Sequence, residues 1–228
     1  MVDDLLLSRA RTLWVTLAGA PATFASPADV VVSPLSMLCP PGWAGVVSLG
    51  GAAIATVPDS AAALALAGLR SWDDPAALVD ELPAAETLGP ATLAYLDPSA
   101  FRPPVGRDVV VGDRADLRTL LASVPAADAD ESGLAEVTSP AYVVRARGVV
   151  VAAAGYHRWP GGAAHVCVLT ARGHRGLGLA RAVAAAATEH ALAAGLLAQW
   201  RARPEASRRV GRALGYRELG WQLSVRLA

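Results

Sequence analysis

The chain has 228 residues, of which 54% are hydrophobic, 18% charged and 5% aromatic. This much apolar surface can build the core of one large domain or two small ones, so the composition excludes a disordered chain. Lys plus Arg and Asp plus Glu each total 20, and the formal net charge of zero excludes a global field that would attract nucleic acid or an anionic membrane.

The N-terminal residues predict a cytoplasmic protein, because Asp3 and Asp4 precede the first apolar run and no basic signal segment is present. Residues 30–58 carry no charge, but Pro and Gly interrupt them, which indicates buried strands and turns in place of a membrane span. Cys39 and Cys167 belong to no CxxC or metal-ligand pattern. We therefore expect two structural thiols in a reducing compartment, and no bound metal.

The first half of the chain alternates helical and strand patterns. Apolar spacing predicts a helix over residues 4–18, and Asp74-Pro75 is a helix-start signal. The remaining elements expected here are strands at 30–32, 45–49 and 52–57 and helices at 60–68 and 74–82. The Pro- and Gly-rich segment 98–107 then indicates a domain boundary, giving residues 1–107 and 108–228.

The second half predicts a mixed sheet. Its expected strands are 109–111, 141–146, 149–157, 165–170, 197–201 and 222–227, and its expected helices are 115–122, 176–194 and 205–214, with an acidic loop or helix at 128–137. The helix 176–194 joins two strands as a crossover, so the sheet cannot be purely antiparallel. The predicted class is α+β, a mostly antiparallel sheet flanked by helices, preceded by a smaller α/β N-terminal domain.

The most informative stretch runs from Arg175 to Ala180, where a Val-rich strand meets Arg-Gly-Leu-Gly-Leu-Ala and a helix of small residues. Glycines at such a turn let backbone N–H groups approach an anion, and a helix N-terminus adds unpaired donors. Close helix–sheet packing is the alternative explanation for Gly176 and Gly178. The lack of a third glycine at GxGxxG spacing, and of any Lys, argues against Rossmann and Walker loops.

These residues resemble the GNAT superfamily of acetyl-CoA-dependent N-acetyltransferases. Its diphosphate pattern, Arg/Gln-x-x-Gly-x-Gly/Ala, is matched by Arg175, Gly178 and Ala180. The likeness continues through residues 204–210 and Leu214-Gly215-Tyr216, and covers about residues 108–228. The N-terminal region is only weakly similar, and a degenerate second GNAT-like half is one interpretation of it.

The resemblance implies acetyl-CoA as co-substrate, with no metal, and an amine that attacks the thioester directly. The main chain of the strand ending in Val168, Leu169 and Thr170 would bind the pantetheine arm. The residues implied for the diphosphate and the rest of the coenzyme are Arg175, Gly176, Leu177, Gly178, Leu179, Ala180, Arg181 and Ser207.

Candidate proton-transfer groups are His165, Glu131, Glu136 and Tyr216. An imidazole can accept a proton near neutral pH, although a half-buried structural histidine is the alternative for His165. The two glutamates lie in the acidic stretch, which can equally be a solvated surface. Tyr216 is a possible proton donor to the leaving thiolate.

Two positions depart from the family pattern: Pro204 replaces a frequent Asn, and Gly211 falls where many members have a Tyr that protonates the thiolate. The expected function is acyl transfer from acetyl-CoA to a primary amine of a small molecule, without nucleic-acid or membrane partners, by a monomer or homodimer. Two alternatives stay open: a non-catalytic acyl-CoA-binding or interaction module, and a loop that binds no nucleotide.

Overall fold

The computed structural model describes residues 4–106 and 108–228. The chain forms two compact units. The first comprises the chain up to Tyr95 together with residues 201–205 and 218–228, and the second comprises residues 96–200 and 206–217. The domain boundary predicted at 107/108 falls on Arg107, which lies outside the described residues.

The first unit combines three helices with a sheet whose strand order is β1-β3-β2-β10-β4. β1 and β3 are parallel, whereas β2 is antiparallel to both β3 and β10. The bounds are α1 (Leu5–Ala18), β1 (Asp29–Val32), β2 (Ala44–Leu49), β3 (Ala52–Val57), α2 (Ser60–Ala67), α3 (Pro75–Glu81), β4 (Ala84–Tyr95) and β10 (Arg217–Leu227).

Each helix of the first unit has an aspartate as its N-cap residue. The side chains of Asp4, Asp59 and Asp74 each accept a hydrogen bond from a backbone N–H of the following first turn. Such caps satisfy donors that a helix leaves unpaired, and each stabilises its helix by about 1 kcal/mol. In this unit, the helix starts predicted from the sequence are confirmed to within one residue.

Strand β4 was missing from the elements predicted from the sequence. Gly89 and Pro90 lie inside it, and a Pro within a strand pattern normally indicates a break. Its first half is largely exposed, but Leu93 and Tyr95 are fully buried. Burial of the second half therefore outweighs the unfavourable local sequence.

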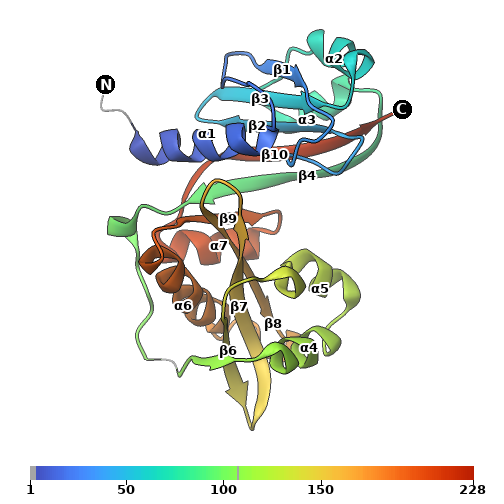
Figure 1. Ribbon diagram of the computed structural model, residues 1–228. Coiled ribbons are helices and arrows are strands. Elements are labelled where there is room, and N and C mark those ends of the chain that lie inside the picture. The colour runs from blue at the N-terminus through green and yellow to red at the C-terminus, as the bar shows by residue number, and fades with distance from the viewer. Residues whose placement is uncertain (1–3, 107) are drawn as a thin grey trace. The chain divides into compact units, whose positions relative to one another are not determined.

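The second unit has the strand order β9-β8-β7-β6-β5. Its elements are η1 (Pro98–Ala100), β5 (Val110–Gly112), α4 (Arg114–Ala122), α5 (Ala126–Ser132), η2 (Leu134–Glu136), β6 (Ala141–Ala146), β7 (Val149–Trp159), β8 (Ala163–Thr170), η3 (Arg172–His174), α6 (Leu179–Ala193), β9 (Leu197–Ala202) and α7 (Glu205–Leu214). Helix α6 packs on β6, β7 and β8, while α4 and α5 cover the other face (Figure 1).

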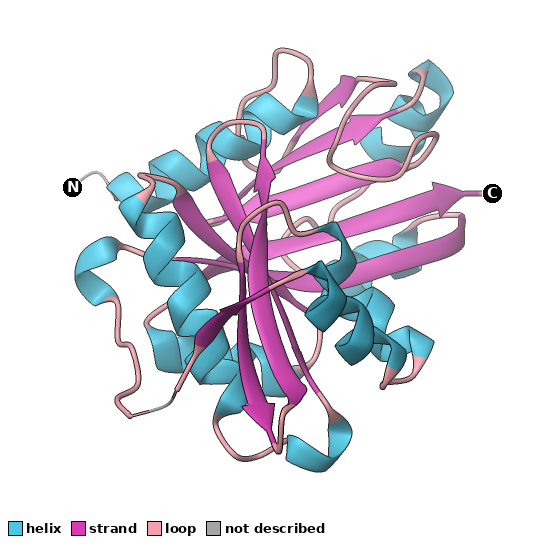
Figure 2. Ribbon diagram, turned by 60° about the horizontal axis from the view of Figure 1, so that its bottom comes forward, coloured by secondary structure: helices cyan, strands magenta, loops and turns pink. Residues whose placement is uncertain are grey.

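The sheet of the second unit confirms the predicted mixed topology. β5 to β8 form antiparallel pairs, and β8 is parallel to β9, the strand reached through α6. The long antiparallel strands and the helices that flank them are visible in Figure 2. The α+β class inferred from the sequence, with a mostly antiparallel sheet between helices, is therefore confirmed.

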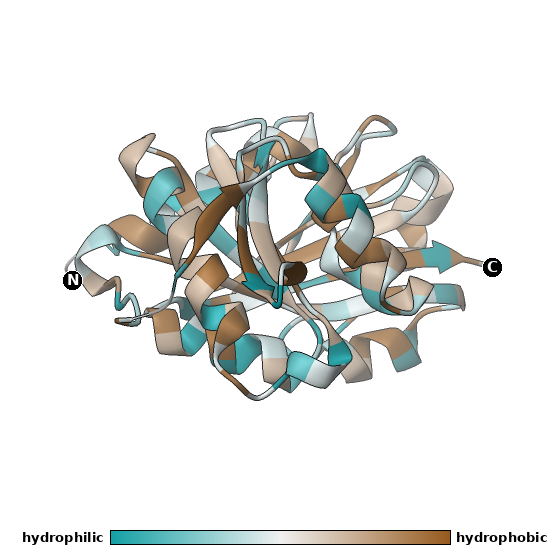
Figure 3. Cartoon of the chain, turned by 90° about the horizontal axis from the view of Figure 1, so that it is seen from below, coloured by the Kyte–Doolittle hydropathy of each residue, from teal (hydrophilic) through white to brown (hydrophobic). Residues whose placement is uncertain are grey.

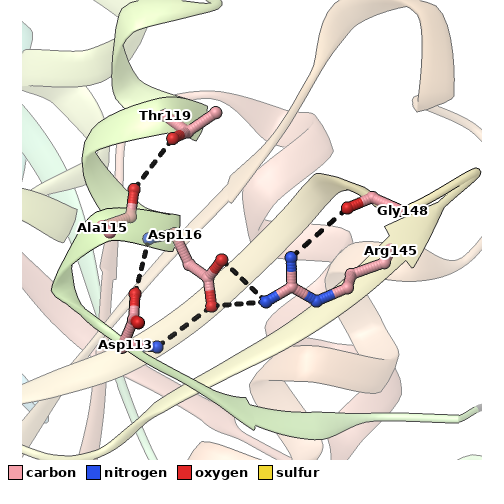
Figure 4. Close-up of polar contacts among 6 residues, drawn as sticks. All are labelled: Asp113, Ala115, Asp116, Thr119, Arg145 and Gly148. Carbon is pink, nitrogen blue, oxygen red and sulfur yellow. Dashed lines mark hydrogen bonds and ion pairs between the residues drawn. The ribbon is translucent and has the colours of Figure 1, made fainter.

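Helix α4 begins with a capping box that is tied to the sheet (Figure 4). The N–H of Asp116 donates to the Asp113 carboxylate at 2.9 Å, and the N–H of Asp113 donates to the Asp116 carboxylate at 3.0 Å. Arg145 of β6 also donates to Asp116, at 2.7 Å. One carboxylate thus orients both the helix start and a strand residue.

Figure 3 shows hydrophobic and hydrophilic residues interspersed along several helices, as expected for helices with one face on a core. Within residues 4–106 and 108–228, no helix combines the length and hydrophobicity needed to cross a membrane.

Candidate functional site

The turn between β8 and α6 needs its glycines for their backbone conformation. Gly176 and Gly178 have φ of +77° and +78°, where L side chains are strained, and a Cβ at either position would meet nothing within 4 Å. Close helix–sheet packing therefore does not explain these glycines. Their conformation turns the chain into the N-terminus of α6.

Helix α6 starts at Leu179, three residues later than predicted, because the left-handed conformation of Gly178 cannot continue a helix. In the described part of the chain, no side chain caps this terminus. The backbone N–H groups of Leu179, Ala180 and Arg181 lie in the first turn, where a helix carries partial positive charge. This end of α6 is suited to an anion.

Two arginines beside this turn share one carboxylate. Arg172 Nε and Arg175 Nη2 donate to Asp128 Oδ2 at 3.1 and 2.9 Å. The guanidinium of Arg172, and after it that of Arg175, lowers the pKa of Asp128, while partial desolvation opposes the shift. Arg175 Nε also donates to the carbonyl oxygen of Thr170 at 3.2 Å, which fastens the loop to the end of β8.

Arg181 directs its guanidinium elsewhere. Its Nη2 donates to the carbonyl oxygen of Arg102 at 3.1 Å. Arg181 was predicted to contact the coenzyme. Because its guanidinium binds Arg102, the backbone N–H of Arg181 is the better-placed group for that contact.

Strands β8 and β9 pair over a short stretch only. Ala163, Ala164 and His165 align with residues 197–199 in parallel, and no further pair between these strands occurs among the described residues. Residues 166–170 of β8 keep their pairing with β7. The β9-facing backbone groups of Val168, Leu169 and Thr170 thus lie past the end of this ladder, at the segment predicted to bind pantetheine.

His165 belongs to the last aligned residue pair between β8 and β9, and its neighbours include a histidine and a tryptophan. It is opposite His157 of β7 in the antiparallel register, and the Trp159 ring lies 4.8 Å from the His165 ring between centroids, at 30°. His157 Nδ1 is 3.9 Å from Glu136 Oε2, a distance at which a charged pair forms when the imidazole is protonated. The structure therefore gathers two of the predicted proton acceptors, His165 and Glu136, around His157.

Glu131 is exposed near the end of α5, about one turn after Asp128. The acidic stretch thus has two parts: Asp128 contacts the arginines, and Glu136 in η2 contacts His157.

Tyr216 is a core residue, 3% exposed. Its hydroxyl is 2.8 Å from that of Thr188 in α6, and burial raises its pKa strongly. Both features favour a structural role, since a buried phenol held by another residue is poorly placed to reach a substrate.

Trp200 explains one departure from the family pattern. A Cβ at Gly211 would lie 3.2 Å from the Trp200 ring, so the indole occupies the space next to this position. Trp200 is 3% exposed, and its Nε1 donates to Ser207 Oγ at 3.2 Å. A side chain at position 211 would therefore require the Trp200 ring to shift, and Ser207 already accepts a hydrogen bond from Trp200.

A concave region lies wholly in the first unit. This cleft of about 550 Å³ is bordered by Ser48, Arg70, Trp72, Asp73 and Trp221, among others, and by none of the residues predicted from the sequence. In the described residues, no group of three or more His, Cys, Asp or Glu is arranged to hold a metal ion.

Sequence reasoning missed Asp128 as a site residue and did not pair His157 with His165. Asp128 precedes Arg172 by 44 residues, and only the packing of α5 beside β8 brings them together. For His157, the register of β7 and β8 was the missing information.

Comparison with known proteins agrees with this geometry. The model of the GNAT acetyltransferase family matches residues 140–220. No curated protein matches the sequence.

Solved structures with a similar arrangement include a GNAT-family protein of Novosphingobium aromaticivorans, at 20% identity and a TM-score of 0.50, with 62% of this chain and 65% of that chain covered. Others are a GNAT-family acetyltransferase of Colwellia psychrerythraea (14% identity, TM-score 0.49, 67% and 60% covered) and a GCN5-related N-acetyltransferase-like protein of Streptococcus suis (23%, 0.49, 69% and 68%). The chain thus spans less than two thirds of the length of the Novosphingobium and Colwellia proteins.

The family match lies on β6 to α7 and includes the glycine turn, the uncapped start of α6 and the parallel β8–β9 pair. The part of this chain from residue 140 to residue 220 is therefore similar to the GNAT acetyltransferase family.

Proposed function

We propose that the protein transfers an acetyl or related acyl group from acetyl-CoA to a primary amine of a small molecule. The observation that carries this proposal is the glycine turn between β8 and the uncapped N-terminus of α6, within the segment that matches the family. Such a turn binds phosphate through backbone N–H groups and the helix dipole.

The coenzyme would lie along β8. Its diphosphate would accept hydrogen bonds from backbone N–H groups between Gly176 and Arg181. The pantetheine arm would pair with the β9-facing main chain of Val168 to Thr170. Five residues separate Thr170 from His165, about 17 Å of extended strand. An extended pantetheine arm spans a comparable distance, which would place the thioester near His165.

His165 is the proposed proton acceptor. The attacking amine must lose a proton as the C–N bond forms, and a neutral imidazole is a suitable base near pH 7. The side chain of His157 is its cross-strand neighbour, with Cβ atoms about 5 Å apart in such pairs. Glu136 Oε2 lies 3.9 Å from His157 Nδ1, and its side chain is 75% exposed, so it would connect this pair of histidines with solvent.

The leaving thiolate of CoA needs no strong acid, because thiols have a pKa only about 1.5 units above neutral pH. The buried Tyr216 is therefore not required, and solvent can supply the proton. The absence of a Tyr at Gly211 is compatible with turnover for the same reason.

The proposal is tested by calorimetry with acetyl-CoA and with desulfo-CoA, followed by an assay of CoA release over a panel of amines. We expect both ligands to bind and at least one amine to accelerate CoA release. If neither ligand binds at about millimolar concentration, coenzyme binding and acyl transfer are both wrong.

The proton acceptor is tested by His165→Gln, with Glu136→Gln and Glu131→Gln as comparisons. We expect His165→Gln to lower kcat/KM by about 100-fold or more and to remove the acidic limb of its pH profile. Glu136→Gln should have a smaller effect and Glu131→Gln the least. Full turnover by His165→Gln would exclude this histidine as the base.

A non-catalytic acyl-CoA-binding module is the second candidate. It is favoured by Gly211, because a tyrosine at this position would require the Trp200 ring, 3.2 Å from a Cβ at Gly211, to shift. Tight CoA binding without release of CoA for any amine in the panel would support this candidate over the enzyme.

A further inference from the structure

The pairing of Asp128 with two arginines is the feature of the second unit that the family pattern does not explain. Asp128 lies in α5, while Arg172 lies in η3 and Arg175 in the turn before α6. One carboxylate oxygen accepts from both guanidinium groups, at 3.1 and 2.9 Å. The Asp128 side chain is 24% exposed, so the contact is partly shielded from water.

This contact restrains two long side chains beside the proposed phosphate site. Arginine side chains lose considerable conformational freedom when a ligand orders them, and that loss weakens binding. Arg172 and Arg175 are already held, the second also through Thr170. Their side chains remain 65% and 50% exposed, so further N–H donors face solvent.

The carboxylate also makes it possible for two like charges to lie together. Two guanidinium groups within about 6 Å of one another repel, and the Asp128 charge between them offsets that repulsion. The three groups carry a net charge of +1, which still attracts a phosphate.

We propose that Asp128 is a positioning residue for the coenzyme: it holds Arg172 and Arg175 in place so that their outward N–H groups contact the phosphates of CoA. This inference rests on the proposed function. It predicts that removing the Asp128 charge weakens CoA binding even though the site becomes more positive. If the carboxylate merely competed with phosphate for the arginines, removing its charge would instead strengthen CoA binding.

The test is Asp128→Asn, which keeps the shape and removes the charge. Asp130→Asn is the matched control, because Asp130 is on the same short helix and exposed. Calorimetry with CoA measures Kd at about 50 mM and about 500 mM salt, between which the screening length falls roughly threefold. Tm measured for each variant reports stability.

We expect Asp128→Asn to raise the Kd for CoA about tenfold, the effect of releasing two rotamer-rich side chains, and Asp130→Asn to stay within about twofold. The loss should persist at high salt, because side-chain ordering is not screened. With an active amine, the KM for acetyl-CoA should rise while kcat stays unchanged. Asp128→Glu, which restores the charge, should recover part of the affinity.

Three results would overturn the inference: an unchanged Kd in Asp128→Asn, tighter binding at low salt that disappears at high salt, or an equal loss in Asp130→Asn. These outcomes leave the proposed function intact, because the unsubstituted protein still binds CoA. Absence of CoA binding by the unsubstituted protein would instead reject both proposals.

Discussion

At the scale of single residues, burial and backbone conformation explain two positions that composition alone would not single out. Cys39 is a free thiol whose Sγ donates to the Trp43 carbonyl oxygen at 3.2 Å. Gly178 has a φ of +78° at the start of α6. Burial sets the reactivity of the Cys39 thiol, and the backbone conformation of Gly178 sets the shape of the proposed phosphate site.

Cys39 should react slowly with alkylating agents. Burial raises its pKa from 9.0 to about 11, against a smaller lowering by a hydrogen bond with Thr56. At pH 8 the thiolate fraction is then about 100-fold smaller than for an unperturbed thiol, and it rises until the pH passes 11. Mass spectrometry after iodoacetamide treatment measures the rate, with urea-unfolded protein as control. Equal rates in folded and unfolded protein would contradict the prediction.

Gly178→Ala should weaken CoA binding and lower the free energy of unfolding by about 1 kcal/mol, because an L residue is strained at positive φ. Gly173→Ala is the control: it lies in the same loop, without positive φ and with open space around a Cβ. Calorimetry with CoA and thermal unfolding measure the two effects. The same loss in both variants would show that flexibility, and not the left-handed conformation, is what matters.

At the scale of elements, helix starts depend on short-range polar contacts. The capping box of α4 is formed by Asp113 and Asp116, and Arg145 of β6 joins it (Figure 4). The N–H of Asp113, first, and the Arg145 guanidinium lower the pKa of Asp116, while desolvation opposes them. The folded state therefore favours the ionised carboxylate.

Asp116→Asn should lower the free energy of unfolding by about 1 kcal/mol at neutral pH. Since the folded pKa of Asp116 is below the usual 3.8, its contribution is complete above about pH 4 and is lost as the pH falls through the folded pKa. Urea unfolding of both proteins at several pH values measures this. The difference between them should shrink in acid, and a difference independent of pH would contradict the role of the ionised carboxylate.

At the scale of the whole molecule, the chain does not divide into consecutive halves. Strand β10 comes from the C-terminus, yet its Leu223 and Val225 are fully buried in the core of the first unit. Leu223 is aligned with Val46 of β2. The last residues of the chain therefore stabilise a unit built mainly from the first ones.

Leu223→Ala should lower the stability of the first unit by about 2–5 kcal/mol, because it leaves a cavity among buried side chains. Hydrogen exchange should become faster in β2 and remain slow in β7, where amides belong to the second unit. Val143→Ala, at a fully buried position of the second unit, should give the reverse. Equal acceleration in both units by either variant would show that they unfold as one.

The amino-acid sequence alone determined the features of the fold that depend only on residues close together in the chain. Aspartate caps, apolar spacing and the Arg175 to Ala180 pattern predicted most elements, the crossover helix and the glycine turn, because capping, periodicity and positive φ are local properties. Strand β4 escaped prediction since burial outweighed Gly89 and Pro90.

Only the tertiary structure decided which distant residues meet. It placed Asp128 against Arg172 and Arg175, aligned His157 with His165, and set Trp200 against Gly211. It also made β10 part of the first unit. These contacts depend on strand register and on which helix faces pack together, and both are set by burial of the whole core rather than by any short segment.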